Sequence, residues 1–176
     1  MISIGIDLSL TGTGVVVIRD GKLVKQELIK SKPAGKKNID ELNRIKNIVT
    51  KIEDIVSIYS PDIAVIENLA FGIVKTTSLT QLAGLNYFTR AMLTDAEIPF
   101  VLVAPTTLKK FATGKGNCPK DNIMMEIYKR WHVTMTNNNL ADAFILAKIG
   151  QALFDDKMKL TAPQQEVINL IKKQNV

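Results

Sequence analysis

The sequence contains one cysteine, Cys118, and one histidine, His132. A single cysteine cannot form an internal disulfide, which fits a reducing compartment, and zinc sites need grouped cysteine and histidine ligands. No apolar run approaches the roughly 20 residues that span a bilayer, and the N-terminus carries no basic leader with a cleavage site. These absences predict a protein of the cytosol, without a membrane segment, that binds any metal ion through oxygen.

The composition favours one folded domain with a basic surface. The chain has 176 residues, 46% of them hydrophobic, which is enough for a sizeable core. It carries 23 lysine and arginine residues against 17 aspartate and glutamate residues, a formal net charge of +6. Many basic residues gather in the stretches 30–51 and 109–130. Solvated helix faces explain part of this pattern, and a nucleic-acid phosphate backbone explains the clusters near glycines better.

Three carboxylates stand at the ends of apolar segments. Asp7 ends the run 1–7, Glu67 ends the run 62–67, and Asp142 opens a helix-like stretch. Open α/β sheets bind ligands outside the carboxyl ends of their strands, and acids from distant segments can together hold a hard cation such as Mg²⁺. Each acid alone has an ordinary alternative role in a turn or at a helix start. The three together favour a shared metal site.

Apolar periodicity and turn residues predict an α/β fold. Strands are expected at 1–7, 15–18, 22–29, 64–67 and 100–103, and a glycine-rich turn at 8–14. Helices are expected at 39–59, 79–92, 120–131 and 140–154, with a short segment at 107–111. This order implies a mixed five-stranded sheet flanked by helices, an arrangement that resembles the ribonuclease H-like fold. We expect one domain over 1–156 and a C-terminal extension over 157–176, with a short amphipathic helix at 163–173 that packs on the domain.

Several short motifs follow one another in a specific order along residues 1–154. They are Ile4-Gly-Ile-Asp7 with Thr11-Gly-Thr-Gly14; Val65-Ile-Glu67; Ala104-Pro105 with Leu108-Lys-Lys110; Thr113-Gly-Lys-Gly116 with Lys120; and Leu140-Ala-Asp-Ala143. In this order and at these spacings, they resemble the RuvC-type Holliday-junction resolvases, including phage-like members.

The resemblance implies an endonuclease that binds four-way DNA junctions as a homodimer and resolves them by paired nicks, in DNA recombination and repair. It implies two Mg²⁺ ions in each active site, with Mn²⁺ as a substitute. Two cations about 4 Å apart can activate water and neutralise charge on the phosphorus. It also implies the cytosol of a bacterium or of a phage-infected host, no membrane and no small-molecule cofactor.

The resemblance also assigns roles to individual residues. Catalytic and metal-binding roles fall on Asp7, Glu67, Asp142 and Asn139, and further catalytic roles on Lys109 and Lys120. DNA-binding roles fall on Lys110, Lys115, Gly114, Gly116, Phe71 and Lys75. Phe71 is a candidate for stacking on an unpaired base, and packing into the core is its ordinary alternative. A solvated surface charge is the ordinary alternative for each lysine.

One position departs from the pattern of the family. The fourth acid of the family lies three residues before Asp142, where this chain has Asn139. Three hypotheses remain open. One of Asn137, Asn138 and Asn139 caps the helix, a favoured role for asparagine; the register slips, so that Asn138 is the equivalent; or the substitution silences the metal site and keeps DNA binding.

Other functions share parts of this pattern. A YqgF-like RNA nuclease has the same fold, and a non-cleaving junction-binding protein is consistent with Asn139. An actin-like or sugar-kinase-like phosphotransferase also has a glycine-rich hairpin after its first strand, but 176 residues leave no room for its second domain. For the dimer surface, the segment 79–92 is a candidate because Ala83 and Gly84 form a small-residue face, a pattern that equally serves internal packing.

Overall fold

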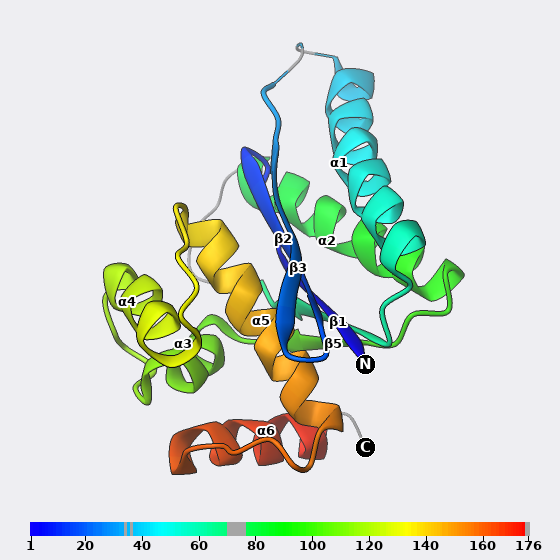
Figure 1. The fold of residues 1–176 in the computed structure, drawn as a ribbon. Coiled ribbons are helices and arrows are strands. Elements are labelled where there is room, and N and C mark those ends of the chain that lie inside the picture. Colours follow the sequence, from blue (N-terminus) through cyan, green and yellow to red (C-terminus); the bar gives the residue numbers. More distant parts are fainter. Residues whose placement is uncertain (34, 36, 70–76, 175–176) are drawn as a thin grey trace.

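The computed structural model describes residues 1–33, 35, 37–69 and 77–174 (Figure 1). Its elements, in chain order, are β1 (Ile2–Asp7), β2 (Gly12–Arg19), β3 (Lys22–Lys30), α1 (Asn38–Tyr59), β4 (Ile63–Glu67), α2 (Thr77–Asp95), β5 (Phe100–Val103), α3 (Pro105–Thr113), α4 (Lys120–Trp131), α5 (Asn138–Phe154) and α6 (Ala162–Gln174).

The five strands form one sheet in the order β3-β2-β1-β4-β5. The pairs β3–β2 and β2–β1 are antiparallel, whereas β1–β4 and β4–β5 are parallel. Asp20 and Gly21 both have positive φ, as the tight hairpin between β2 and β3 requires. The predicted mixed five-stranded sheet flanked by helices is therefore confirmed.

Two hydrophobic cores lie on opposite faces of the sheet. Ile4 and Val15 belong to the core under α1 and α2. Val16 and Val65 belong to the core under α5, which also takes in residues of α3, α4 and α6. Figure 1 shows α1 and α2 on one side of the strands and α5 on the other. The alternation of side chains along each strand produces this division.

Helix α5 crosses β1 and β2 in backbone contact. A Cβ atom on Gly5 would lie 2.0 Å from the carbonyl oxygen of Ala143, and one on Gly14 would lie 2.2 Å from that of Asn139. Ser3 in β1 adds a hydrogen bond, because its Oγ donates to the carbonyl of Ala147 at 2.8 Å. The glycines of the first two motifs thus let a buried helix approach the sheet, so they do not form the open phosphate-binding hairpin of a kinase.

Most predicted elements appear within a few residues of their expected bounds, and one boundary was wrong. The turn expected at 8–14 is shorter, because β2 already begins at Gly12. Gly14 pairs with Asp7 and Leu28, so strand pairing extends further toward the turn than the predicted strand at 15–18.

The last helix, α6, packs against the body of the protein. Val167, Ile168 and Ile171 are buried in the core that α5 covers, and Gln164 Nε2 donates to the carbonyl of Phe111 in α3 at 3.3 Å. In the described ranges, no helix has the length and hydropathy to cross a bilayer.

Candidate active site at the carboxyl edge of the sheet

The carboxyl ends of the parallel strands β1 and β4 carry two of the predicted acids. Because Ile6 pairs with Ile66, Asp7 and Glu67 are the next residues on these adjacent strands, which lie about 4.8 Å apart. Glu67 follows Val65 by two residues and so belongs to the face that α5 covers. Asp7 lies two residues beyond the glycine of β1 that contacts α5. Both acids therefore share one edge and one face of the sheet.

The third acid comes to the same face on α5. Asn139 lies over Gly14, and Ala143 lies over Gly5, one helical turn further along. Asp142 stands in the turn between these two contact points, and Gly14 is the residue that pairs with Asp7. The crossing of α5 over two glycines thus brings segments more than 130 residues apart in sequence to one edge.

The donor chemistry of this edge fits a hard divalent cation. Asp7 is buried, Glu67 and Asp142 are half-buried, and all three offer only oxygen. Within the described residues, no three Asp, Glu, His or Cys side chains are grouped as a metal cluster. The structure places the three acids on a common edge, and their convergence on a single cation remains a prediction.

The three asparagines at the start of α5 have different environments. Asn137 is the N-cap, since its Oδ1 accepts from the backbone N–H of Asn139 at 2.8 Å and of Leu140 at 3.4 Å. The Nδ2 of Asn139 donates to the carbonyl of Gly12 in β2. The Oδ1 of Asn138 is buried and has no hydrogen-bond donor among the described residues. Asn137 thus takes the capping role, and Asn138 holds the amide oxygen that still lacks a partner.

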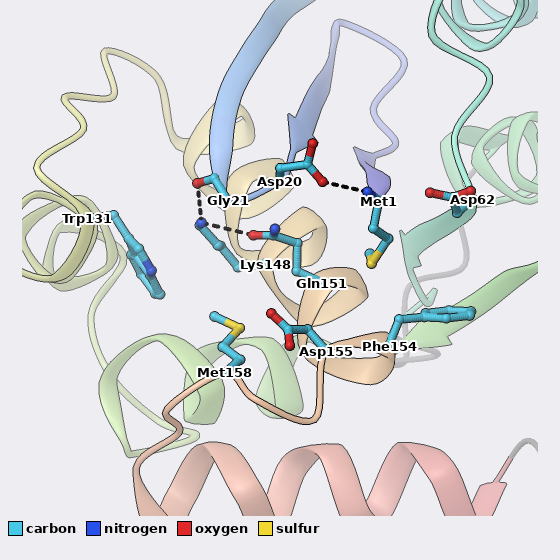
Figure 2. A pocket seen from close by; sticks show the side chains of 10 residues that line it. All are labelled: Met1, Asp20, Gly21, Asp62, Trp131, Lys148, Gln151, Phe154, Asp155 and Met158. Carbon is cyan, nitrogen blue, oxygen red and sulfur yellow. Dashed lines mark hydrogen bonds and ion pairs between the residues drawn. The ribbon is translucent and has the colours of Figure 1, made fainter.

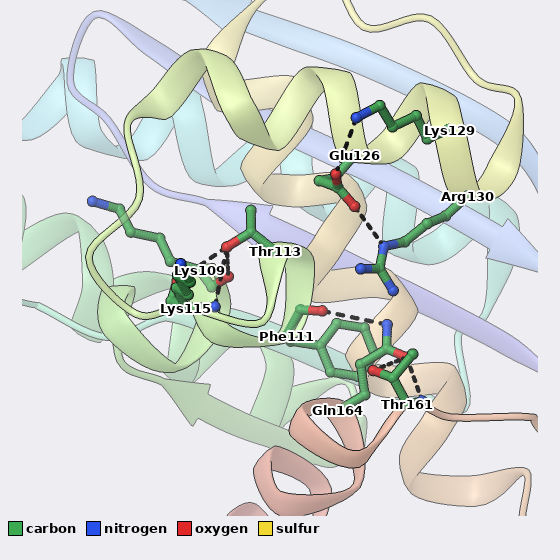
Figure 3. Close-up of polar contacts among 9 residues, drawn as sticks. All are labelled: Lys109, Phe111, Thr113, Lys115, Glu126, Lys129, Arg130, Thr161 and Gln164. Atoms are coloured by element: carbon green, nitrogen blue, oxygen red, sulfur yellow. Dashed lines mark hydrogen bonds and ion pairs between the residues drawn. The ribbon is translucent and has the colours of Figure 1, made fainter.

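The basic loop after α3 is held by a threonine (Figure 3). The hydroxyl of Thr113 lies 3.0 Å from the carbonyl oxygens of both Lys109 and Lys115, which share its one proton. Gly114 has a φ of +83° and ends α3, with its N–H bonded to the carbonyl of Lys110. A Cβ on Gly116 would lie 3.1 Å from the carbonyl of Thr106, so this loop folds back on α3. The predicted basic residues of α3 and the loop are thereby brought together.

Acidic partners divide the basic residues into two groups. Lys110 forms a salt bridge with Glu166 of α6 at 2.5 Å. Glu126 pairs with Lys129 at 3.6 Å and with Arg130 at 2.9 Å, as Figure 3 shows. In the part of the chain that the structure describes, Lys109 and Lys115 form no salt bridge. The charges of these two lysines are therefore not offset by an acidic side chain of the described residues.

Three predicted residues lie wholly or partly outside the described part of the chain. Phe71 and Lys75 lie outside the described residues. Lys120 begins α4, and its side chain is also outside the description.

Sequence reasoning missed two polar features of α5, one at the candidate site and one further along the helix. The Asn139–Gly12 bond joins residues 127 positions apart, and no local pattern signals it. Lys148, a charged residue within an otherwise apolar helix, is buried at 4% exposure. Its isolation among apolar neighbours was a signal that the sequence did contain.

Comparison with known proteins shows the family to which the chain is similar. The family model of the crossover junction endodeoxyribonuclease RuvC matches residues 3–149. A crossover junction endodeoxyribonuclease RuvC of Carboxydothermus hydrogenoformans is 30% identical over 155 residues, covering 84% of this chain and 93% of the relative. The RuvC of Rickettsia akari is 31% identical over 153 residues, covering 84% and 94%.

A solved structure shows the same fold. Thermus thermophilus RuvC in complex with a Holliday junction substrate superposes with a TM-score of 0.72 at 19% identity, covering 84% of this chain and 90% of the other. The expected ribonuclease H-like architecture of RuvC nucleases is therefore confirmed.

Proposed function

Because this chain belongs to the RuvC family of crossover junction endodeoxyribonucleases, we propose that it binds four-way DNA junctions as a homodimer and resolves them by paired nicks. The observation that carries the proposal is the placement of Asp7, Glu67 and Asp142. They lie on one edge and one face of the sheet.

We assign the three acids to a metal-binding role in phosphodiester hydrolysis. Divalent cations such as Mg²⁺ supply charge neutralisation and an activated water when bound to such a donor set. Asp7 is the most buried of the three acids, and its position is fixed by strand β1, of which it is the last residue. The position of Asp142 is fixed by the packing of α5 on β1. For the fourth oxygen, the position of the family's motif favours Asn139, and the unpartnered Oδ1 favours Asn138. We propose that each active site binds two such ions.

The DNA phosphates are assigned to Lys109, Lys115 and Lys120. The first two have no competing salt bridge in the described structure, and Thr113 joins their backbones (Figure 3). Lys110 contributes less, because Glu166 offsets its charge. We retain Phe71 and Lys75 as proposed DNA contacts from the motif pattern, with Gly114 and Gly116 shaping the loop.

We propose that the dimer surface lies on the exposed part of α2. The small-residue face predicted there is used internally, because Gly84 lies against Ile45 of α1. Tyr87 and Phe88 follow Gly84 by three and four residues, so they lie on the same side of the helix about one turn further along, and they are 64% and 44% exposed. Two exposed aromatics on one helix suit an isologous contact between identical subunits.

We also propose that residues 1–156 form the nuclease domain and that 157–176 form an extension bracing α3. The hydrogen bond from Gln164 to Phe111 (Figure 3) and the salt bridge of Glu166 with Lys110 support the packing of this extension on α3. Through α3, the extension steadies the segment that carries Lys109 and Lys110.

A second candidate function is junction binding without cleavage. The observation in its favour is Asn139, a neutral residue where the family pattern has an acid, whose amide is bonded to Gly12. Three carboxylates leave the charge of two divalent ions less compensated than four would.

The test uses three labelled substrates: a synthetic four-way junction, a linear duplex and a flap, each with Mg²⁺, Mn²⁺ or EDTA. We expect paired nicks in the junction with either metal and none with EDTA. Tight junction binding with no cleavage under any condition would select the second candidate. Cleavage of linear duplex at the same rate would contradict both.

A further inference from the structure

A cavity of about 960 Å³ lies at the end of the sheet opposite the acids. It is lined by residues near the start of β1, the β2–β3 turn, and the last turns of α5, among them Met1, Gly21 and Gln151 (Figure 2). Met1 and Asp7 are separated by the length of β1, roughly 20 Å at 3.3 Å per residue. The cavity is therefore distinct from the proposed nuclease site, and its volume is within the range of small-molecule pockets.

The central polar group of this cavity is the ammonium of Lys148. Its Nζ donates to the carbonyl of Gly21 at 2.9 Å and to Oε1 of Gln151 at 3.0 Å. Lys148 is only 4% exposed, and no carboxylate of the described residues forms an ion pair with it. An ammonium has three N–H donors, so these two acceptors leave one donor for a ligand.

Burying a cation without an anionic partner is costly. Desolvation lowers the pKa of Lys148 to about 8, so the ammonium form still predominates at neutral pH. The rings of Trp131 and Phe144, at 5.8 and 5.6 Å, provide part of the compensation. A ligand anion at Nζ would provide the charge that the protein does not.

Other charged groups line the cavity and limit which ligands fit. Asp20 is paired with the amino group of Met1 at 2.6 Å, and Asp62 accepts from the N–H of Ile2 at 2.6 Å. Asp155 accepts from the N–H of Lys157 at 3.0 Å. These acids repel a ligand with several negative charges, such as a nucleotide. A ligand with a single negative charge therefore suits the cavity best.

The remaining walls are apolar. Figure 2 shows Trp131 to one side of Lys148 and Phe154 to the other, with Met158 near Trp131. Phe154 is 56% exposed, so part of its ring is available for contact. We propose that this cavity binds a small monocarboxylate with an aliphatic or aromatic body, whose carboxylate accepts a hydrogen bond from Lys148 and whose body contacts Trp131 and Phe154.

The test uses the fluorescence of Trp131, the single tryptophan of the chain. The probes are octanoate, octanamide and octylamine, added below their micellar concentrations to the full-length protein. They share an alkyl body and differ in charge. We expect saturable binding of octanoate, at least about tenfold tighter than octanamide, because hydrogen bonds between charged groups are stronger than neutral ones. Equal affinities, tighter binding of octylamine, or no saturable change with octanoate would overturn the proposal.

Two variants locate the site. Lys148→Met should weaken octanoate binding at least about tenfold, whereas Lys159→Met, which removes the same charge from an exposed position outside the cavity, should leave it unchanged. Unaltered octanoate affinity in a folded Lys148→Met protein would refute the assignment. If this variant does not fold, the wild-type protein still decides: octanoate binding should weaken between pH 7 and 8.5, as Lys148 loses its proton. The Met1 amino group, whose pKa is raised by its hydrogen bond to Asp20, loses its proton at higher pH. DNA cleavage is not measured, so failure here leaves the proposed function untouched.

Discussion

The bond between Asn139 and Gly12 makes a specific prediction for Asn139→Asp. In the native protein, the Nδ2 of Asn139 donates to the carbonyl of Gly12 at a half-buried position. An aspartate cannot donate this bond when ionised and instead brings two oxygens toward a carbonyl. Leaving such a group unsatisfied costs about 1–3 kcal/mol. Without metal, we expect the free energy of unfolding to fall by that amount.

Asn138→Asp is the matched control. Both substitutions add one negative charge within the first turn of α5, where the helix dipole favours it by about 0.3–1 kcal/mol. Asn138 Oδ1 has no hydrogen bond to lose in the described structure. Because this oxygen is buried, Asn138→Asp has a desolvation cost of its own, so a larger loss of stability in Asn139→Asp than in Asn138→Asp reports the Gly12 bond. The assay is urea unfolding followed by circular dichroism in EDTA.

Adding Mg²⁺ then tests whether the new carboxylate binds metal. A ligand at 100 times its Kd stabilises the folded state by about 2.7 kcal/mol, enough to offset the lost bond. We expect Mg²⁺ to stabilise Asn139→Asp more than the wild-type protein and to raise junction cleavage, with junction affinity nearly unchanged. Equal unfolding energies for both variants in EDTA would refute the Gly12 argument. An unchanged Mg²⁺ response would place Asn139 outside the metal site.

Three further predictions follow from particular contacts. Gly5→Ala should lower the free energy of unfolding by at least about 3 kcal/mol in denaturant titrations, because its Cβ would lie 2.0 Å from the carbonyl of Ala143; a loss under 1 kcal/mol would contradict the crossing of α5. Lys115→Ala should reduce the slope of log affinity for junction DNA against log salt by about one, and the ion-paired Lys110 should give a smaller change. Because the pKa of Lys148 is lowered from 10.5 to about 8, the unfolded chain binds more protons between these values, and stability should rise with pH there by up to about 3 kcal/mol. Lys148→Met should remove this rise, and an identical pH profile would show that Lys148 is not its source.

The elements of the fold were predictable because their signals are local. The hairpin followed from Asp20-Gly21 between apolar strands, and α1 followed from apolar spacing ended by Pro61. The start of β2 at Gly12 was missed, because a glycine-rich segment has the composition of a turn. Only the packing of α5 explains why Gly14 lies in a strand.

The sequence was sufficient to predict which strands and which helix carry the candidate site, but not the contacts that its side chains make. Strand ends and helix starts were enough to place Asp7, Glu67 and Asp142 at one edge. Which of three successive asparagines caps α5 could not be predicted, because all three have the same propensity and tertiary contacts decide. The pairing of Lys110 with Glu166, 56 residues away, is likewise invisible to local patterns.

The central claim is that the carboxyl edge of the sheet is a metal-dependent junction-cutting site, and Asp7→Asn tests it most directly. The substitution nearly preserves shape and removes one charge from the most buried acid of that edge. Cleavage of a labelled four-way junction in Mg²⁺ should fall at least about a hundredfold, since metal-ion stabilisation of the transition state is worth several kcal/mol. Junction affinity, measured in the same samples by gel shift in Ca²⁺ or EDTA, should stay within about threefold. Cleavage by Asp7→Asn at the wild-type rate would contradict the account.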